Sequence, residues 1–202
     1  MSGLIYSWDF NGTLTDSVQC IALKNESNAT FVQYSQSVKI IYLYRGYLSA
    51  PPGIYFSGIF TVCVWVQIKS QRTWTRILDF GNGRLDSVVL LFSYSSTGFP
   101  SFALANGDQT ISYPSSNRKL MIGEWTHLAF VNDGSKAYIY INGTLNAQQG
   151  LNGQIGNVTR TNCYKGKSNF PDPLADSYYK FLNIYNKQLT DSDIRNDMRL
   201  FL

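Results

Sequence analysis

The sequence predicts an all-β protein, built as a sandwich of two antiparallel sheets with one short helix near its C-terminal end. Of its 202 residues, 44% are hydrophobic, 15% aromatic and only 15% charged, and Glu occurs only as Glu26 and Glu124. β-Branched and aromatic residues favour strands, whereas the helix formers Glu and Met are scarce. Ser, Thr, Asn and Gly recur about every 8–12 residues, the turn spacing of an antiparallel sandwich. This composition argues against a helical bundle or a coiled coil.

Strands are predicted in the first half wherever apolar runs lie between turn residues. The residues of Phe60–Ile68 are almost all apolar, with Cys63 and Trp65 on one face and five apolar side chains on the other, so a central strand covered on both faces is expected. Pro51 and Pro52 interrupt the chain before it, because proline cannot donate to a ladder. The other strands expected in this half are Leu4–Phe10, Lys39–Tyr44, Arg76–Phe80 and Ser87–Tyr94.

Hairpins and a final helix are predicted in the second half. Asn106-Gly107-Asp108 and Asp133-Gly134 are turn signals of hairpins. Thr190 is a suitable N-cap, and Asp191 and Asp193 suit the positive end of a helix dipole, so Thr190–Arg199 is expected to be helical. The strands expected here are Ser101–Ala105, Gln109–Tyr113, Trp125–Asn132, Lys136–Ile141, Thr144–Ala147 and Tyr178–Tyr185.

The order of five motifs resembles a known family. They are Phe60-Thr-Val-Cys-Val-Trp-Val66, Ile77-Leu-Asp-Phe-Gly-Asn-Gly83, Gly123-Glu-Trp-Thr-His-Leu-Ala-Phe130, Ala137-Tyr-Ile-Tyr-Ile-Asn-Gly143 and Phe181-Leu-Asn-Ile-Tyr-Asn-Lys-Gln-Leu-Thr190. This series resembles the laminin G-like, concanavalin A-like jelly-roll modules of extracellular proteins over residues 4–200. The resemblance implies two curved antiparallel sheets packed face to face. With no linker or repeat in sight, residues 1–202 are expected to form one such domain, with Trp65 and Trp125 as large core residues.

Several function classes are disfavoured. The net charge is +4, but the basic residues are scattered, whereas nucleic-acid binders gather them on one face. No run of 18 apolar residues exists to span a membrane. Glycosidases with this kind of fold need a close carboxylate pair, which Glu26 and Glu124 do not form. A hydrolase would need His127 as its base, but its place in a packed strand makes it a structural histidine. We therefore expect a non-catalytic protein.

Glycosylation sequons indicate an extracellular location, which bears on the state of the cysteines. Five Asn-x-Ser/Thr sequons occur, at Asn11, Asn25, Asn28, Asn142 and Asn157. Cys63 lies in an apolar run and is expected to be a buried thiol. In an oxidising compartment we expect Cys20 to pair with Cys163, although three cysteines allow three pairings.

Two kinds of binding residue are candidates. Relatives of the family bind calcium at one rim, which here would use Asp79 and Asn82, with Asp16 and Asp176 as further candidates; the alternative is that Asp79 and Asn82 only hydrogen-bond their own turn. No other cofactor is indicated. Trp74 could stack on a sugar or anchor a protein interface, or it could simply cover the core. The aromatic residues near turns are Trp74, Tyr94, Phe99, Tyr113, Tyr164 and Phe170.

Two functions remain open. The first is an adhesive or self-assembling structural glycoprotein subunit, whose partner is another copy of itself in an oligomer or filament. Low charge favours it, because it reduces repulsion between like subunits. The second is a recognition module that binds a glycan or a protein at the cell surface or matrix. The first is the preferred expectation.

Overall fold

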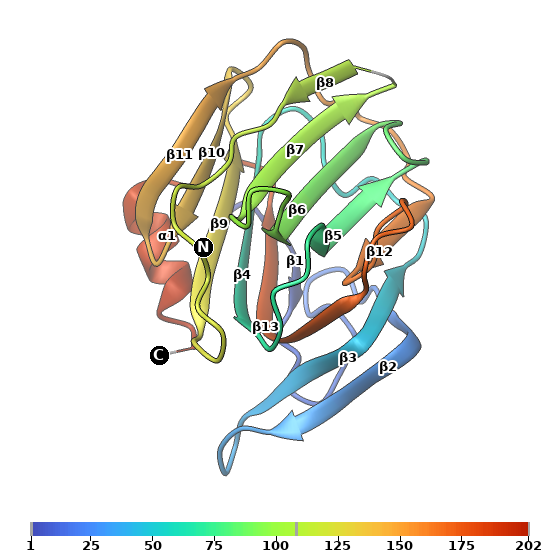
Figure 1. The fold of residues 1–202 in the computed structure, drawn as a ribbon, viewed down its shortest axis with the longest axis vertical. Coiled ribbons are helices and arrows are strands. Elements are labelled where there is room, and N and C mark those ends of the chain that lie inside the picture. The colour runs from blue at the N-terminus through green and yellow to red at the C-terminus, as the bar shows by residue number, and fades with distance from the viewer. Residues whose placement is uncertain (1, 108, 202) are drawn as a thin grey trace.

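The structure, a computed structural model, describes residues 2–107 and 109–201. Every strand pairing within them is antiparallel, and one short helix follows the last strand, so the predicted fold class is confirmed (Figure 1). Asp108, predicted in a hairpin turn, lies outside the described residues. The elements are β1 (Leu4–Trp8), β2 (Lys24–Gln33), β3 (Lys39–Ala50), β4 (Phe60–Ile68), β5 (Thr75–Gly81), β6 (Val88–Tyr94), β7 (Ser101–Asn106), β8 (Gln109–Ser112), β9 (Thr126–Asn132), β10 (Lys136–Ile141), β11 (Thr144–Gly150), β12 (Asn162–Lys165), β13 (Ala175–Tyr185) and α1 (Asp191–Met198).

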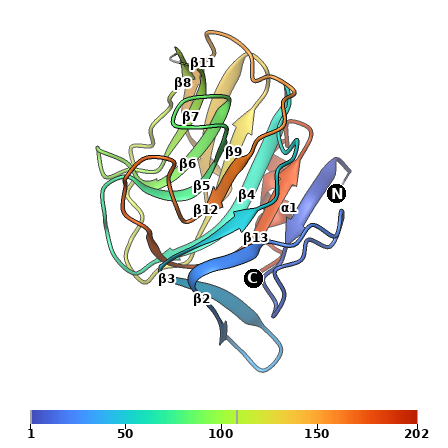
Figure 2. The same cartoon turned by 90° about the vertical axis from the view of Figure 1, so that its right-hand side faces the viewer.

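The two layers of the sandwich are joined by hydrogen bonds. The strands follow one path, in the order β11-β10-β9-β4-β13-β3-β12-β5-β6-β7-β8, with β1 beside β13 and β2 beside β3. The path bends so that β5–β8 pack across β10, β9, β4 and β13 (Figures 1 and 2). The expected two sheets are therefore present as layers, but β3 and β12 connect them along one edge.

Strand β3 makes this connection because it bends near its middle. Its first part, up to Gly46, pairs with β13, and its last residues, Leu48–Ala50, pair with β12. Arg45 has a φ of 48°, and a Cβ added to Gly46 would lie 2.2 Å from the carbonyl oxygen of Ser27 on β2. Only glycine allows β2 and β3 to approach this closely at the bend.

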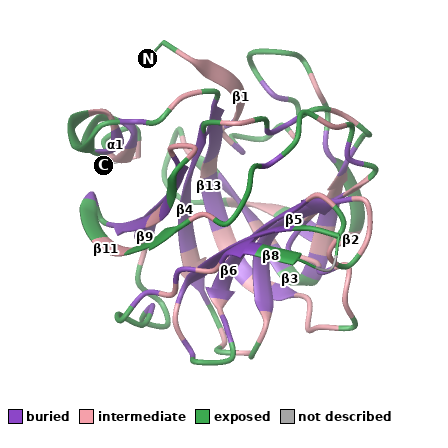
Figure 3. Cartoon of the chain, turned by 90° about the horizontal axis from the view of Figure 1, so that it is seen from above, coloured by how far each residue is buried: buried purple, intermediate pink, exposed green. Residues whose placement is uncertain are grey.

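The main core lies between the layers. It is formed largely by alternate side chains of β4, β6, β7 and β9. These strands are almost completely buried (Figure 3). The opposite sides of the same strands carry two smaller apolar clusters. One lies under α1 and includes Cys63, Ala129 and Ile194. The other lies on the outer side of β6 and β7, around Leu90 and Phe92.

Some sequence expectations differ from the structure. Strands β2 and β12 were not predicted, because their polar sequences resemble loops, and β3 continues to Ala50 beyond the predicted Tyr44. Trp65 is buried as expected, though under α1 and not between the layers. Trp125 is only half-buried, since it precedes β9 and packs on Phe201 and Tyr34 near the surface.

The predicted helix is confirmed with its cap. The Thr190 hydroxyl accepts a hydrogen bond from the Asp193 backbone N–H, and the Asp193 carboxylate accepts one from the Thr190 N–H, which forms a capping box. Ile194 turns inward against the sheet. The helix therefore begins at Asp191, where the sequence places it, and covers the outer side of β4 and β9.

Candidate functional site

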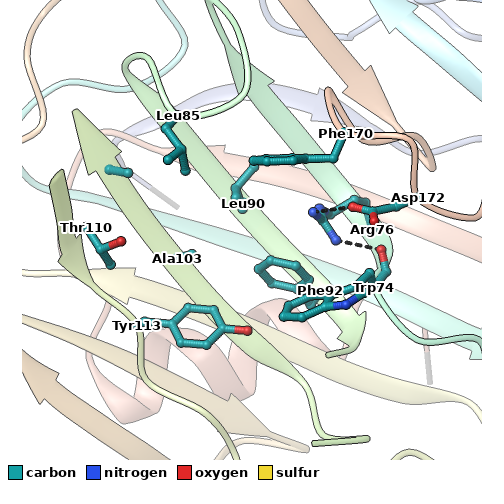
Figure 4. A pocket seen from close by; sticks show the side chains of 11 residues that line it. Trp74, Arg76, Leu85, Leu90, Phe92, Ala103, Thr110, Tyr113, Phe170 and Asp172 are labelled. Carbon is teal, nitrogen blue, oxygen red and sulfur yellow. Dashed lines mark hydrogen bonds and ion pairs between the residues drawn. The ribbon is translucent and has the colours of Figure 1, made fainter. Parts of the chain in front are cut away.

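A groove of about 400 Å³ lies on the outer side of the β5–β8 layer. Leu90 and Phe92 on β6, with Ala103 and Ala105 on β7, form its floor, because these alternate positions face away from the core. Small side chains on β7 beside large ones on β6 leave the floor hollow. Figure 4 shows the walls around this floor. They are formed by Trp74, Arg76, Leu85, Thr110, Tyr113, Phe170 and Asp172.

Aromatic rings give the groove its shape. The Phe92 ring lies edge-on between Trp74 and Tyr113, with centroid distances of 5.8 Å to each. Trp74 is only partly buried, and its backbone has a φ of 67°, which is unfavourable for a non-glycine residue. Such strain persists only where the surroundings hold a residue in place, and it is concentrated at functional sites. Trp74 is therefore held with its ring at the groove.

Arg76 links the aromatic rings to the polar end of the groove. Its guanidinium carbon lies 4.0 Å from the centroid of the Phe92 ring. Nη1 donates to the Trp74 carbonyl at 2.5 Å and Nη2 to the Asp172 carboxylate at 2.8 Å, as Figure 4 shows. Burial lowers the pKa of Arg76, while Asp79 and Asp172 oppose this shift. The side chain is nearly fully buried, so it orders the wall of the groove.

The two candidate calcium ligands, Asp79 and Asn82, have different hydrogen-bond partners in the structure. The Asp79 carboxylate is fully buried and accepts hydrogen bonds from Asn169 and Ser168. Burial raises its pKa, against the effect of these bonds. The Asn82 side-chain oxygen instead accepts from Thr161. Calcium needs six to eight oxygens directed at one point, and these two side chains hold different parts of the chain together. Nor do they simply bond their own turn, the alternative that the sequence left open.

The other two acidic candidates are also engaged separately. The Asp16 carboxylate accepts hydrogen bonds from the backbone N–H groups of Ser7, Val18 and Gln19. Asp176 accepts one from the Tyr42 hydroxyl at 2.9 Å. None of these contacts joins Asp16 or Asp176 to Asp79. The residues that the family resemblance nominated therefore do not converge on one ion.

The predicted disulfide is not formed. Cys20 is exposed in a loop, whereas Cys163 is buried on β12 with its thiol against the Arg160 carbonyl, and both are free thiols, as is Cys63. Cys163 faces the core, which an exposed loop cysteine does not reach. The pairing of Cys20 with Cys163 is therefore corrected to two unpaired cysteines in the structure. Cys63 is buried, as expected.

His127 belongs to a buried cluster under α1. Its Nε2 donates to the Asp197 carboxylate at 2.9 Å, and Asn183 and Tyr185 donate to the same group at 2.7 and 2.6 Å. The Cys63 thiol also lies within 4.8 Å of the His127 and Asp197 ligand atoms. Cys, His and Asp are all residue types that can coordinate a metal ion. The Asp197 carboxylate, however, already accepts hydrogen bonds from three side chains. The cluster links α1 to the sheet, and His127 has a structural role in it.

The five sequon asparagines are all exposed, including Asn142 in its tight turn with a φ of 49°. Their side chains differ in availability. The Asn25 amide donates to the Ala29 carbonyl at 2.7 Å, and the Asn11 amide makes a longer contact to Ser37 at 3.4 Å. The Asn142 Oδ1 accepts a hydrogen bond from the His127 backbone N–H at 2.9 Å, whereas the Asn28 and Asn157 side chains make no hydrogen bond with the described residues.

Three of the six aromatic candidates from the sequence line the groove. Trp74, Tyr113 and Phe170 come together at the groove from three distant parts of the chain, whereas Tyr94, Phe99 and Tyr164 do not line it. Arg76 and Asp172 were missed, because no local pattern shows that a strand residue will meet a loop about a hundred positions later. The signal for the floor was the run of apolar residues on both faces of β6 and β7, since such a run predicts that the outer face is also covered.

Solved structures confirm the fold at low sequence identity. Domain 4 of AbnA, a GH43 extracellular arabinanase from Geobacillus stearothermophilus in complex with arabinotriose, matches with a TM-score of 0.81 and 20% identity, over 96% of this chain and 97% of that one. The binding domain of botulinum neurotoxin DC in complex with SialylT matches with a TM-score of 0.69 and 15% identity, over all of this chain but 52% of that one. The botulinum neurotoxin serotype C1 binding domain gives 0.71 and 13%, over 99% and 52%.

Sequence comparison places the chain in a family. No curated protein sequence matches it. Among the described residues, no helix has the length and apolar character needed to cross a membrane. The family model Laminin_G_3 matches residues 44–195, which is well over half of the chain. The fold, the order of motifs and this match agree, and the chain belongs to the Laminin_G_3 family of the concanavalin A-like lectin/glucanase superfamily.

Proposed function

We propose that the protein is a glycan-binding module and that the groove on the β5–β8 layer holds the sugar. One observation carries this proposal: an open apolar groove on a sheet face is lined by Trp74, Phe92 and Tyr113, with the Arg76–Asp172 pair at one end. A sugar ring has apolar C–H faces and a polar edge. Aromatic rings can pack against the faces, while a few placed polar groups fix the orientation.

The solved structures support this proposal through their ligands. The arabinanase domain is in complex with arabinotriose, and one toxin binding domain is in complex with SialylT. At 20% identity or less they share only the fold with this chain, so their ligands do not identify its sugar. They favour glycan binding over self-assembly as the function to test first. The adhesive, self-assembling subunit remains a prediction.

The non-catalytic role and the location outside the cell are part of the same proposal. His127 is buried in the α1 cluster, and Glu26 and Glu124 are both exposed, with Glu26 bound to Lys24 and Ser49. The five exposed sequon asparagines favour secretion and N-glycosylation. Peptide mass spectrometry of protein from a secreting eukaryotic host should find glycans at Asn28 and Asn157. Their absence there would contradict the glycosylation part of the proposal.

Replacement of Trp74 by alanine tests the groove. Trp74→Ala should weaken binding to glycans selected on an array by at least about tenfold, because a central aromatic anchor is lost. Trp125→Ala is the matched control: this tryptophan is also half-buried, but it lies outside the groove beside Phe201. Affinities are measured by calorimetry, and melting curves confirm folding. Equal losses in both variants, or no glycan bound by the wild type, would refute the proposal.

A further inference from the structure

The charges at the groove are balanced within the protein. Among the described residues, Arg76 is the only basic one that lines it, and its two terminal nitrogens donate to the Trp74 carbonyl and the Asp172 carboxylate. Its Nε lies 3.8 Å from the Asp79 carboxylate, a second counter-charge behind the wall. A ligand anion would therefore meet a guanidinium whose charge already faces two carboxylates, and whose Nε, which has no hydrogen-bond partner among the described residues, is buried.

The accessible charge at the groove is negative. The side chain of Asp172 keeps 18% of its surface exposed, whereas that of Arg76 keeps 3%. Asp172 therefore faces the ligand space more than its partner does. A carboxylate or sulfate on a ligand would approach this like charge and lose its hydration without gaining a cation.

The remaining polar groups of the groove are uncharged. The Tyr113 hydroxyl is buried, with Ser95 and Ser101 near it, so Tyr113 lines the groove with its ring and not with its hydroxyl. The Thr110 hydroxyl lies on the same side of the groove (Figure 4). Hydroxyls can donate to and accept from the hydroxyls of a sugar. With the Asp172 oxygens as acceptors, the exposed Thr110 hydroxyl matches a ligand that carries hydroxyls and no charge.

From these observations, and resting on the proposed glycan-binding function, we infer that the groove selects uncharged saccharides over acidic ones. The residue that could oppose this is Arg84, an exposed cation whose guanidinium carbon lies 5.7 Å from the centroid of the Phe170 ring. Arg84 does not line the groove. It could attract an acidic glycan only from the rim, which a variant can test separately.

Matched pairs of glycans test the inference. The wild-type protein is offered neutral oligosaccharides and the same oligosaccharides capped with sialic acid or a uronic acid, and affinities are measured by calorimetry at low and moderate salt. We expect each acidic cap to weaken binding by at least about tenfold. Neutral binding should change little with salt, because no ion pair with the ligand is formed.

Two variants make the outcome specific. Asp172→Asn removes the exposed negative charge and leaves Arg76 less compensated, so it should raise the affinity for acidic glycans several-fold. Arg84→Gln should leave neutral binding unchanged. If melting curves show that Asp172→Asn is unfolded, the wild-type glycan pairs and Arg84→Gln still decide the inference.

The possible results separate the two proposals. Preference for acidic glycans, with affinity that falls as salt rises, would overturn the selectivity and leave the glycan-binding function standing. The same preference abolished by Arg84→Gln would place acid recognition at the rim and also overturn it. If no glycan of either kind binds, both the function and the selectivity fail.

Discussion

The outer side of β4, β9 and β13 differs sharply from the outer side of β6 and β7. On the first, α1 covers a cluster in which His127, Asn183 and Tyr185 all donate to Asp197. On the second, apolar side chains line a groove that no described helix or strand covers. In the first region the chain supplies the partner for the sheet face. In the second, the described chain leaves an apolar face uncovered, as the proposed binding site requires.

Among the changes that test this contrast, removal of the Asp197 carboxylate should have the largest effect on stability. Asp197→Ala leaves buried donors on three residues without an acceptor, so the free energy of unfolding should fall by about 3–5 kcal/mol. Asn196→Ala is the control, because Asn196 is an exposed neighbour on α1 and should change stability by less than about 0.5 kcal/mol. Urea unfolding measures both. Similar small losses would mean that the cluster does not anchor the helix.

A matched pair of tyrosine variants sharpens the contrast. The Tyr185 hydroxyl donates to Asp197 at 2.6 Å, whereas the Tyr113 hydroxyl has no partner among the described residues. Tyr185→Phe should therefore cost about 1.5–3 kcal/mol of stability, the value of a hydrogen bond to a charged group. Tyr113→Phe should leave stability nearly unchanged.

Ligand binding should show the reverse order. Tyr113→Ala should weaken glycan binding several-fold by removing an aromatic ring from the wall of the groove, while Tyr185→Phe should not affect it below the melting temperature. Denaturant unfolding and calorimetry on the same samples give both quantities. A stability loss in Tyr113→Phe as large as that in Tyr185→Phe would show that the groove side is also a closed structural cluster.

The smallest expected effect is a loss of stability at low pH, which depends on one carboxylate in the β9–β10 turn. Asp133 lies in the β9–β10 turn. Partial burial opposes its ionisation, but hydrogen bonds from Tyr138, Ser135 and Lys136 lower its pKa from 3.8 to about 2. Its contribution is therefore complete above pH 4 and lost as the pH falls through about 2. Asp79 beside the groove is shifted the other way, since burial raises its pKa.

The Asp133→Asn variant isolates the charge, because an asparagine oxygen can still accept from the turn. Above pH 4 it should be less stable than the wild type by about 1 kcal/mol or less, given solvent screening of this site. The difference should disappear toward pH 2. Urea unfolding between pH 2 and 6 measures it, and a difference that persists at pH 2 would assign the effect to geometry and not to ionisation.

The sequence predicted the fold better than the site, for physical reasons. The predicted strands Phe60–Ile68 and Lys136–Ile141 have the same bounds as β4 and β10. Such strands can be predicted because apolar patterns and turn residues are local features of the sequence. β12 was missed because its four residues become a strand only by pairing with β3 and β5. The Arg76–Asp172 pair depends on the loop before β13 crossing β5, a contact that no local pattern encodes.

The position of β13 in the strand order determines when the fold can be completed. β13 lies between β4 and β3 and also pairs with β1, yet its residues, Ala175–Tyr185, are synthesised near the end of the described chain. Until they emerge, the facing edges of β3 and β4 have no partner, and unpaired edges promote association between chains. Folding during synthesis therefore cannot finish strand by strand, and a nascent chain depends on protection of these edges until its last strand is inserted.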